Sequence, residues 1–99
     1  MKVSVFCALG MSTSVVVKRI QKEAKEQGVE LEIEAFSVND IEKYAPGSDV
    51  ILIGPQISYR EEELQKEFPD IPVVVMNTRD YGMGNGKNIL KAIRKAVEK

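Results

Sequence analysis

The stretch KVSVFCALGMSTSVVV, residues 2–17, begins the pattern that decides the fold. Lys2 to Phe6 is a β-branched and aromatic run, which predicts a short strand. From near Ser12 to Gln27, apolar residues recur at every fourth position, which predicts a helix that Gly28 stops. The chain therefore opens with a strand, a short loop that contains Cys7, and a helix.

Strands and helices continue to alternate along the rest of the chain. Strands are expected at residues 30–36, 50–53 and 73–76, and helices at residues 39–44, 59–68 and 87–98. The second strand alternates apolar and acidic residues, as at a sheet edge, whereas the third, VILI, is apolar throughout, as in a sheet centre. Before the last helix, the glycines of GMGNGKN are expected to make a flexible turn.

This alternation predicts the fold class. Strands joined through helices form right-handed crossovers, which give a parallel sheet with helices on both faces. We expect an α/β fold with an open four-stranded sheet in the order 2-1-3-4. Residues 1–99 are expected to form a single domain, since a chain of 99 residues supports one hydrophobic core.

The composition argues against several classes of function. The 14 basic and 15 acidic residues give a net charge of -1, which argues against a nucleic-acid partner. No apolar run approaches the roughly 20 residues that a membrane-spanning helix needs, and no signal-peptide core is visible, so we expect a soluble, cytoplasmic protein. With one cysteine and no histidine, neither a disulfide nor a zinc cluster is expected. The lack of histidine also removes the Cys-His pair, the Ser-His-Asp triad and a phosphohistidine carrier.

The loop after the first strand borders the expected binding site. In an open α/β sheet, ligands bind at the carboxyl ends of the strands, here between strands 1 and 3. The N-terminus of the following helix binds anions and lowers the pKa of a nearby thiol. Gly10 allows an anion nest, and the hydroxyls of Ser12, Thr13 and Ser14 can cap the helix or donate to phosphate. This pattern indicates a phosphate-binding loop with Cys7 as the nucleophile.

A purely structural interpretation of the same loop is also open. Unpaired cysteines are often buried as small hydrophobic residues. The Ser-Thr-Ser run is also a common way of starting a helix. The position of Cys7 at the switch point of the sheet favours the functional interpretation.

The run CALGMSTSVVV closely resembles the phosphorylation loop C-x-x-G-M-S-T-S of the enzyme IIB components of the bacterial sugar phosphotransferase system, in the lactose/cellobiose/chitobiose family. The likeness continues through EAF at residues 34–36, ILIGPQISY at residues 51–59 and the pair Tyr81-Gly82, and covers essentially the whole chain. It implies a cytoplasmic phosphocarrier that associates peripherally with the inner face of the membrane through a IIC component.

The resemblance also implies roles for residues and partners. A IIA protein with a phosphohistidine would phosphorylate Cys7, and the phosphocysteine would supply a β-linked disaccharide such as cellobiose, chitobiose or lactose held by the membrane-embedded IIC. No cofactor, metal or direct membrane insertion is implied, and we expect a monomer in isolation. The phosphate loop would comprise Ala8, Leu9, Gly10, Met11, Ser12, Thr13 and Ser14.

Two later segments border the same edge of the predicted sheet. In GPQISY, Gln56 and Tyr59 could reach the phosphate or a docking partner, or could simply shape the turn and begin a helix. Tyr81 follows the fourth strand, and its side chain could either contact the phosphate or pack in the core.

The main alternative is a low-molecular-weight tyrosine phosphatase, which has a similar fold and a C-x5-R-S loop after strand 1. Here the same count from Cys7 reaches Thr13, so the arginine that stabilises the transferring phosphoryl group is missing. Asp80 is the only candidate for the late general acid. A nucleotide-binding loop at residues 82–88 is disfavoured because the glycine spacing is wrong. A receiver domain is disfavoured because Gly54 stands where that fold has its aspartate.

Overall fold

The computed structural model describes residues 1–7 and 10–98, and for residues 10–12 it describes the backbone alone. The long elements are β1 (Lys2–Cys7), α1 (Gly10–Glu26), β2 (Glu32–Ser37), β3 (Val50–Ile53), α3 (Glu61–Glu67), β4 (Val73–Val75) and α5 (Gly86–Val97). The short ones are η1 (Val38–Asp40), α2 (Ile41–Tyr44), η2 (Pro55–Arg60) and α4 (Thr78–Met83).

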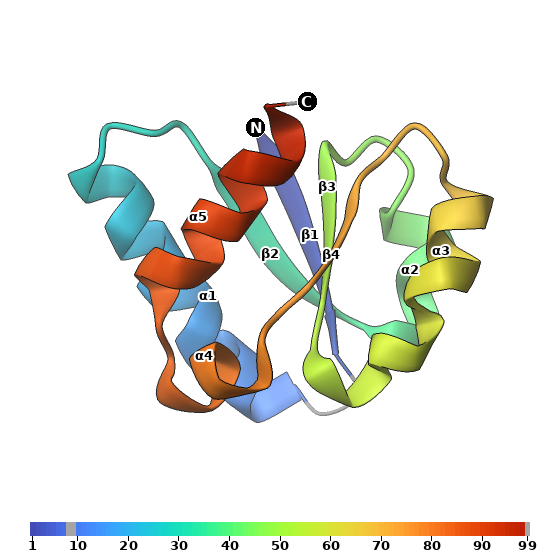
Figure 1. Ribbon diagram of the computed structural model, residues 1–99, viewed down its shortest axis with the longest axis horizontal. Helices are drawn as coiled ribbons and strands as arrows, with labels where there is room; N and C mark the ends of the chain where they lie inside the picture. Colours follow the sequence, from blue (N-terminus) through green and yellow to red (C-terminus); the bar gives the residue numbers. More distant parts are fainter. Residues whose placement is uncertain (8–9, 99) are drawn as a thin grey trace.

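The strands form one parallel sheet in the order β2-β1-β3-β4, which confirms the predicted topology. In the register, Val3 of β1 lies opposite Ile33 of β2 on one side and Val50 of β3 on the other. Helices α1, α4 and α5 cover one face of the sheet, and α2 and α3 cover the other (Figure 1). The chain termini lie at the amino ends of the strands, opposite the start of α1 (Figure 1).

Each face of the sheet has its own hydrophobic core. The residues Val3, Val5 and Cys7 of β1 pack with α1 and α5, whereas Phe6 packs with α2 and α3. The predicted apolar stripe of α1 is confirmed, since Val16, Ile20 and Ala24 are all buried. All four residues of β3 are buried, as expected for a central strand, whereas β2 keeps its glutamates exposed at the edge.

The segment before the last helix differs from the expectation. Residues 78–83 form α4 and Gly86 begins α5, so the expected turn before the last helix is confined to Gly84 and Asn85, and its predicted extent was wrong. The side chain of Asn77 caps this helix by accepting from the backbone N–H groups of Arg79 and Asp80, and Gly84 ends it with φ of 64°. These two caps compensate for the low helix propensity of Gly82.

Two smaller boundaries also differ. Helix α1 begins at Gly10 rather than near Ser12, so the hydroxyl residues belong to its first turns. The expected helix at residues 59–68 is divided into η2 and α3. Val97, the last residue of α5, is 39% exposed, whereas Leu90 of the same helix is buried.

Helices α1 and α5 approach closely. A Cβ on Gly86 would lie 2.5 Å from the backbone oxygen of Arg19, so only glycine fits at the start of α5. Among the residues that the structure describes, no helix is long and apolar enough to cross a bilayer.

Candidate functional site

Cys7 lies at the carboxyl end of β1, where the connections to β2 and β3 leave the sheet on opposite sides. It is the last residue of the strand and is 3% exposed. The backbone N–H of Gly54 donates to the carbonyl of Phe6 at 3.0 Å and extends the pairing of β1 with β3 up to this point. The thiol is therefore held by strand pairing at the carboxyl ends of β1 and β3.

Two side chains from distant parts of the chain contact this thiol, and a third, Thr13, contacts one of them. Cys7 Sγ donates to Gln56 Oε1 at 3.5 Å and lies 3.5 Å from Tyr81 Oη. Tyr81 Oη in turn lies 3.4 Å from Thr13 Oγ1. Helix α4 is what brings Tyr81 to the site, and Tyr81 and Thr13 are both buried there. The structure thus brings together Cys7, Thr13, Gln56 and Tyr81 from the predicted set.

The rest of the predicted phosphate loop is described only in part. Ala8 and Leu9 lie outside the described residues, and Gly10, Met11 and Ser12 form the start of α1, described by their backbone. Ser14 is exposed on α1, one residue beyond buried Thr13. The N-terminus of a helix of 17 residues therefore begins three positions after Cys7, which is the arrangement that favours an anion next to the thiol.

Tyr59 differs from the other candidates because it does not pack in this cluster. Its side chain is 79% exposed on η2. Of the two interpretations left open, this exposure is consistent with a role in docking. Gln56 is also exposed as a whole residue, although its amide oxygen reaches the sulfur.

Gly54 is a site residue that sequence reasoning missed. A Cβ at this position would lie 3.0 Å from Cys7 Sγ and 2.7 Å from Gln56 Oε1, so a side chain would push on the thiol and on its partner. The Gly-Pro pair marked the end of a strand in the sequence, but nothing local indicated that the sulfur occupies the space above it. Only the pairing of β1 with β3 creates this contact.

The described groups at the site are a thiol, two hydroxyls and an amide, next to a helix N-terminus. The described residues hold no cluster of three metal-ligating side chains. Thr13 occupies the position at which the phosphatase loop has its arginine, and its hydroxyl is engaged with Tyr81. Such a set can hold a phosphoryl group on sulfur without a cation to accelerate its hydrolysis.

Comparisons with known proteins agree with this arrangement. The family model of the PTS system, lactose/cellobiose specific IIB subunit, matches residues 2–92. A galactose-specific EIIB component of Lactococcus lactis subsp. cremoris is 39% identical over 91% of this chain and 90% of its own length. An oligo-beta-mannoside-specific EIIB component of Bacillus subtilis is 39% identical over 87% of this chain and 85% of its own.

Solved structures show the same fold. The solution structure of a cellobiose-specific IIB component from Borrelia burgdorferi superposes with a TM-score of 0.73 at 33% identity, covering 100% of this chain and 95% of the other. A lactose-specific IIB domain from Streptococcus pneumoniae gives a TM-score of 0.75 at 23% identity over 99% of this chain and 95% of that one. The chain belongs to the lactose/cellobiose-specific IIB family of the phosphotransferase system, whose members are phosphocarrier components of sugar phosphotransferases.

Proposed function

We propose that Cys7 is the residue that carries the phosphoryl group in this IIB protein. The observation that supports it is the convergence of Gln56 and Tyr81 on the Cys7 sulfur, next to the N-terminus of α1. The thiolate is stabilised by this helix end and by hydrogen bonds from neighbouring donors. We further propose that the protein acts in the cytoplasm as a monomer with residues 1–99 as one domain.

The proposed cycle has two transfers. In the first, the Cys7 sulfur attacks the phosphorus of a phosphohistidine on a IIA protein; the P–N bond breaks, an S–P bond forms, and the released imidazole takes up the thiol proton. In the second, a sugar hydroxyl oxygen attacks the same phosphorus, the S–P bond breaks and Cys7 leaves as the thiolate. The hydroxyl proton passes to a base on the partner that holds the sugar.

Each neighbour has a distinct role in this proposal. The backbone N–H groups at the start of α1 bind the phosphoryl oxygens. Tyr81 donates from its hydroxyl to the sulfur and is held in place by Thr13. Gln56 accepts the thiol hydrogen before transfer, and its amide N–H can turn to the phosphoryl group afterwards.

The sugar is the least constrained part of the proposal. The relatives are named for galactose, cellobiose and oligo-beta-mannoside, so the IIB fold accommodates transport systems for different sugars. We propose a β-linked disaccharide such as cellobiose, chitobiose or lactose, bound by a membrane-embedded IIC partner.

Intact mass measured under non-acidic conditions tests the carrier role. The protein is incubated with phosphoenolpyruvate, the general phosphotransferase enzymes and a IIA protein. One added phosphoryl group is expected, dependent on IIA, and Cys7→Ser is expected to remain unmodified.

Two results would overturn this proposal. The first is a phosphoryl group that persists in Cys7→Ser. The second is the lack of any adduct with several IIA proteins together with thiol-dependent hydrolysis of an aryl phosphate, which would favour the phosphatase alternative.

A further inference from the structure

The two helical layers of the protein differ in charge. Helix α1 carries four basic and two acidic residues, and α5 carries four basic residues and no acidic one. On the opposite face of the sheet, α3 has four glutamates and one lysine. Although the net charge is only -1, α1 and α5 form a basic layer and the layer around α3 is acidic.

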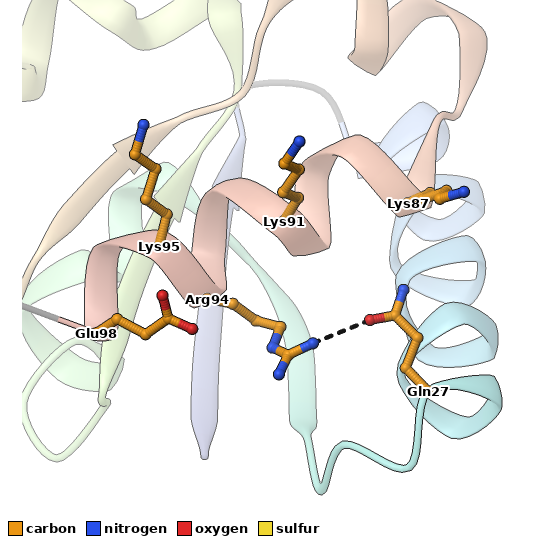
Figure 2. A pocket seen from close by; sticks show the side chains of 6 residues that line it. All are labelled: Gln27, Lys87, Lys91, Arg94, Lys95 and Glu98. Atoms are coloured by element: carbon orange, nitrogen blue, oxygen red, sulfur yellow. Dashed lines mark hydrogen bonds between the residues drawn. The ribbon is translucent and has the colours of Figure 1, made fainter.

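The basic layer includes a groove of about 630 Å³ along α5. Figure 2 shows the Lys91 and Lys95 side chains leaving α5 on one side, while Arg94 leaves on the other side toward Gln27 at the end of α1. Lys87, Lys91 and Lys95 follow one another at intervals of four, so they form a row along the helix.

No carboxylate among the described residues forms an ion pair with these cations, although Glu98 lines the same groove. Among residues 1–7 and 10–98, Arg60 and Glu63 form the only ion pair, and they lie in the other layer. Arg94 donates from Nη1 to Gln27 Oε1 at 3.1 Å, a neutral partner that orients the guanidinium without neutralising it. Lys87, Lys91 and Lys95 are all exposed.

We propose that the basic layer of α1 and α5 rests on an anionic lipid surface. This inference depends on the proposed function, in which the phosphoryl acceptor is bound by a membrane protein. Clustered basic residues are attracted to the negative surface of a cytoplasmic leaflet, and no insertion is required. The acidic layer around α3 is repelled by the same surface, so the two layers together orient the molecule.

The chemistry of the layer favours lipid over a protein partner. Lysine is depleted in protein interfaces, whose cores are apolar and aromatic. The groove is lined instead by Gln27, by four cations and by Glu98, with no aliphatic or aromatic residue among them, and the exposed Val15 and Val97 of the same layer lie outside it. A flat sheet of headgroups fits an extended row of lysines, because it needs neither shape complementarity nor a pocket.

The placement of Cys7 is compatible with this orientation. Helix α1 begins at the end of the sheet where Cys7 lies, whereas α5 begins beside Arg19 of α1; both helices run from there towards the amino ends of the strands (Figure 1). Lipid contact along their outer surface therefore leaves the Cys7 end uncovered. A partner in or on the membrane can reach the thiol while the basic layer stays adsorbed.

Co-sedimentation with vesicles tests the proposal. The full chain is mixed at low salt with vesicles of equal parts phosphatidylglycerol and phosphatidylcholine, and with vesicles of phosphatidylcholine alone. Binding is expected only to the anionic vesicles and is expected to weaken as salt is raised. Replacing Lys87, Lys91 and Lys95 by Gln should weaken binding by about fivefold per residue, on the order of a hundredfold together.

A matched control variant distinguishes the effect of the basic layer on binding from the effect of net charge. Lys2, Lys43 and Lys66 are exposed and lie outside α1 and α5, so replacing them by Gln changes the net charge equally. This variant is expected to bind anionic vesicles nearly as well as the wild type. Circular dichroism confirms that both triple variants are folded.

Several outcomes would overturn the proposal. These are no binding of the wild type to anionic vesicles at low salt, equal losses in the two triple variants, or full binding by the α5 variant. Binding of an acidic peptide or of nucleic acid through the same lysines without lipid binding would also replace it. Phosphorylation of Cys7 by a soluble donor, measured separately on the α5 variant, tests the proposed function independently.

Discussion

At the scale of single residues, the environment of the Cys7 sulfur is the central feature. Its neighbours include an amide oxygen from η2, after β3, and a phenol from α4, after β4. The thiol is 3% exposed, so the proposed transfer requires a donor protein to displace part of what covers it. Transfer is therefore sensitive to the side chains around the thiol as well as to the thiol itself.

Replacing Tyr81 by Phe tests the phenol. The ring is buried and keeps its packing, whereas the hydroxyl contacts to Cys7 and Thr13 are lost. A hydrogen bond to a charged group contributes about 1.5–3 kcal/mol, so phosphorylation of Cys7 is expected to slow at least about tenfold. Rapid-quench mass spectrometry with phosphorylated IIA measures this rate.

Tyr59→Phe is the matched control for this phenol, because Tyr59 is 79% exposed. We expect its phosphorylation rate to stay near that of the wild type. An unchanged rate in Tyr81→Phe would show that the Tyr81 hydroxyl serves packing alone.

Replacing Gly54 by Ala tests the space beside the sulfur. The new Cβ would lie 3.0 Å from Cys7 Sγ, which is too close, so the thiol must shift and phosphorylation should slow. The same Cβ also meets the flexible Gln56 side chain at 2.7 Å. In a double variant with Gln56→Ala, the defect beyond that of Gln56→Ala alone measures the sulfur contact. Equal rates for these two variants would show that the sulfur contact is unimportant.

At the scale of elements, α4 and the start of α5 form the region of the molecule next to the site. Helix α4 has six residues and depends on its caps, Asn77 and Gly84, rather than on an apolar stripe. It places Tyr81 against the thiol. The turn that follows then brings α5 onto α1, where Gly86 allows the close contact.

Replacing Gly86 by Ala is expected to destabilise this contact. The added Cβ would lie 2.5 Å from a backbone oxygen of α1, which cannot rotate away. Overpacking of this kind costs about 1–3 kcal/mol, and each 1 kcal/mol lowers the Tm of a domain of this size by about 4–8 °C. Thermal unfolding followed by circular dichroism measures the change.

Gly82→Ala is the matched control, because a Cβ there meets nothing within 4 Å. Alanine has the higher helix propensity, so this variant should be as stable as the wild type or slightly more stable. Equal stability of Gly86→Ala and the wild type would contradict the tight helix contact.

At the scale of the whole molecule, the sheet joins two hydrophobic cores and separates two layers of different charge. Strands β1 and β3 contribute to both cores, because their side chains alternate between the faces. Neither core is complete without the sheet. The helical layers, by contrast, remain electrostatically distinct because the sheet lies between them.

The shared sheet predicts a single cooperative unfolding transition. In calorimetry, we expect one peak with equal calorimetric and van't Hoff enthalpies, and an unfolding enthalpy of about 60–80 kcal/mol near 60 °C. Two resolved transitions would contradict the proposal that residues 1–99 form one domain.

Much of this fold is visible in the sequence. Apolar periodicity and capping residues are local, so they predicted the four strands and the long helices. The alternation of these elements then predicted the order of the sheet. The loop around Cys7 predicted the chemistry, and the family comparison confirmed the resemblance. Helix α4 escaped prediction because three glycines in residues 82–86 obscured its caps.

The sequence by itself determined the class of fold, the family and the candidate nucleophile, because each depends on residue types at fixed spacing along the chain. Only the tertiary structure decided that Gly54 and Tyr81 meet the sulfur, since those contacts depend on how strands pair and helices dock. It also decided where the charges gather. A near-zero net charge is a sum over the chain, whereas a partner meets one face at a time.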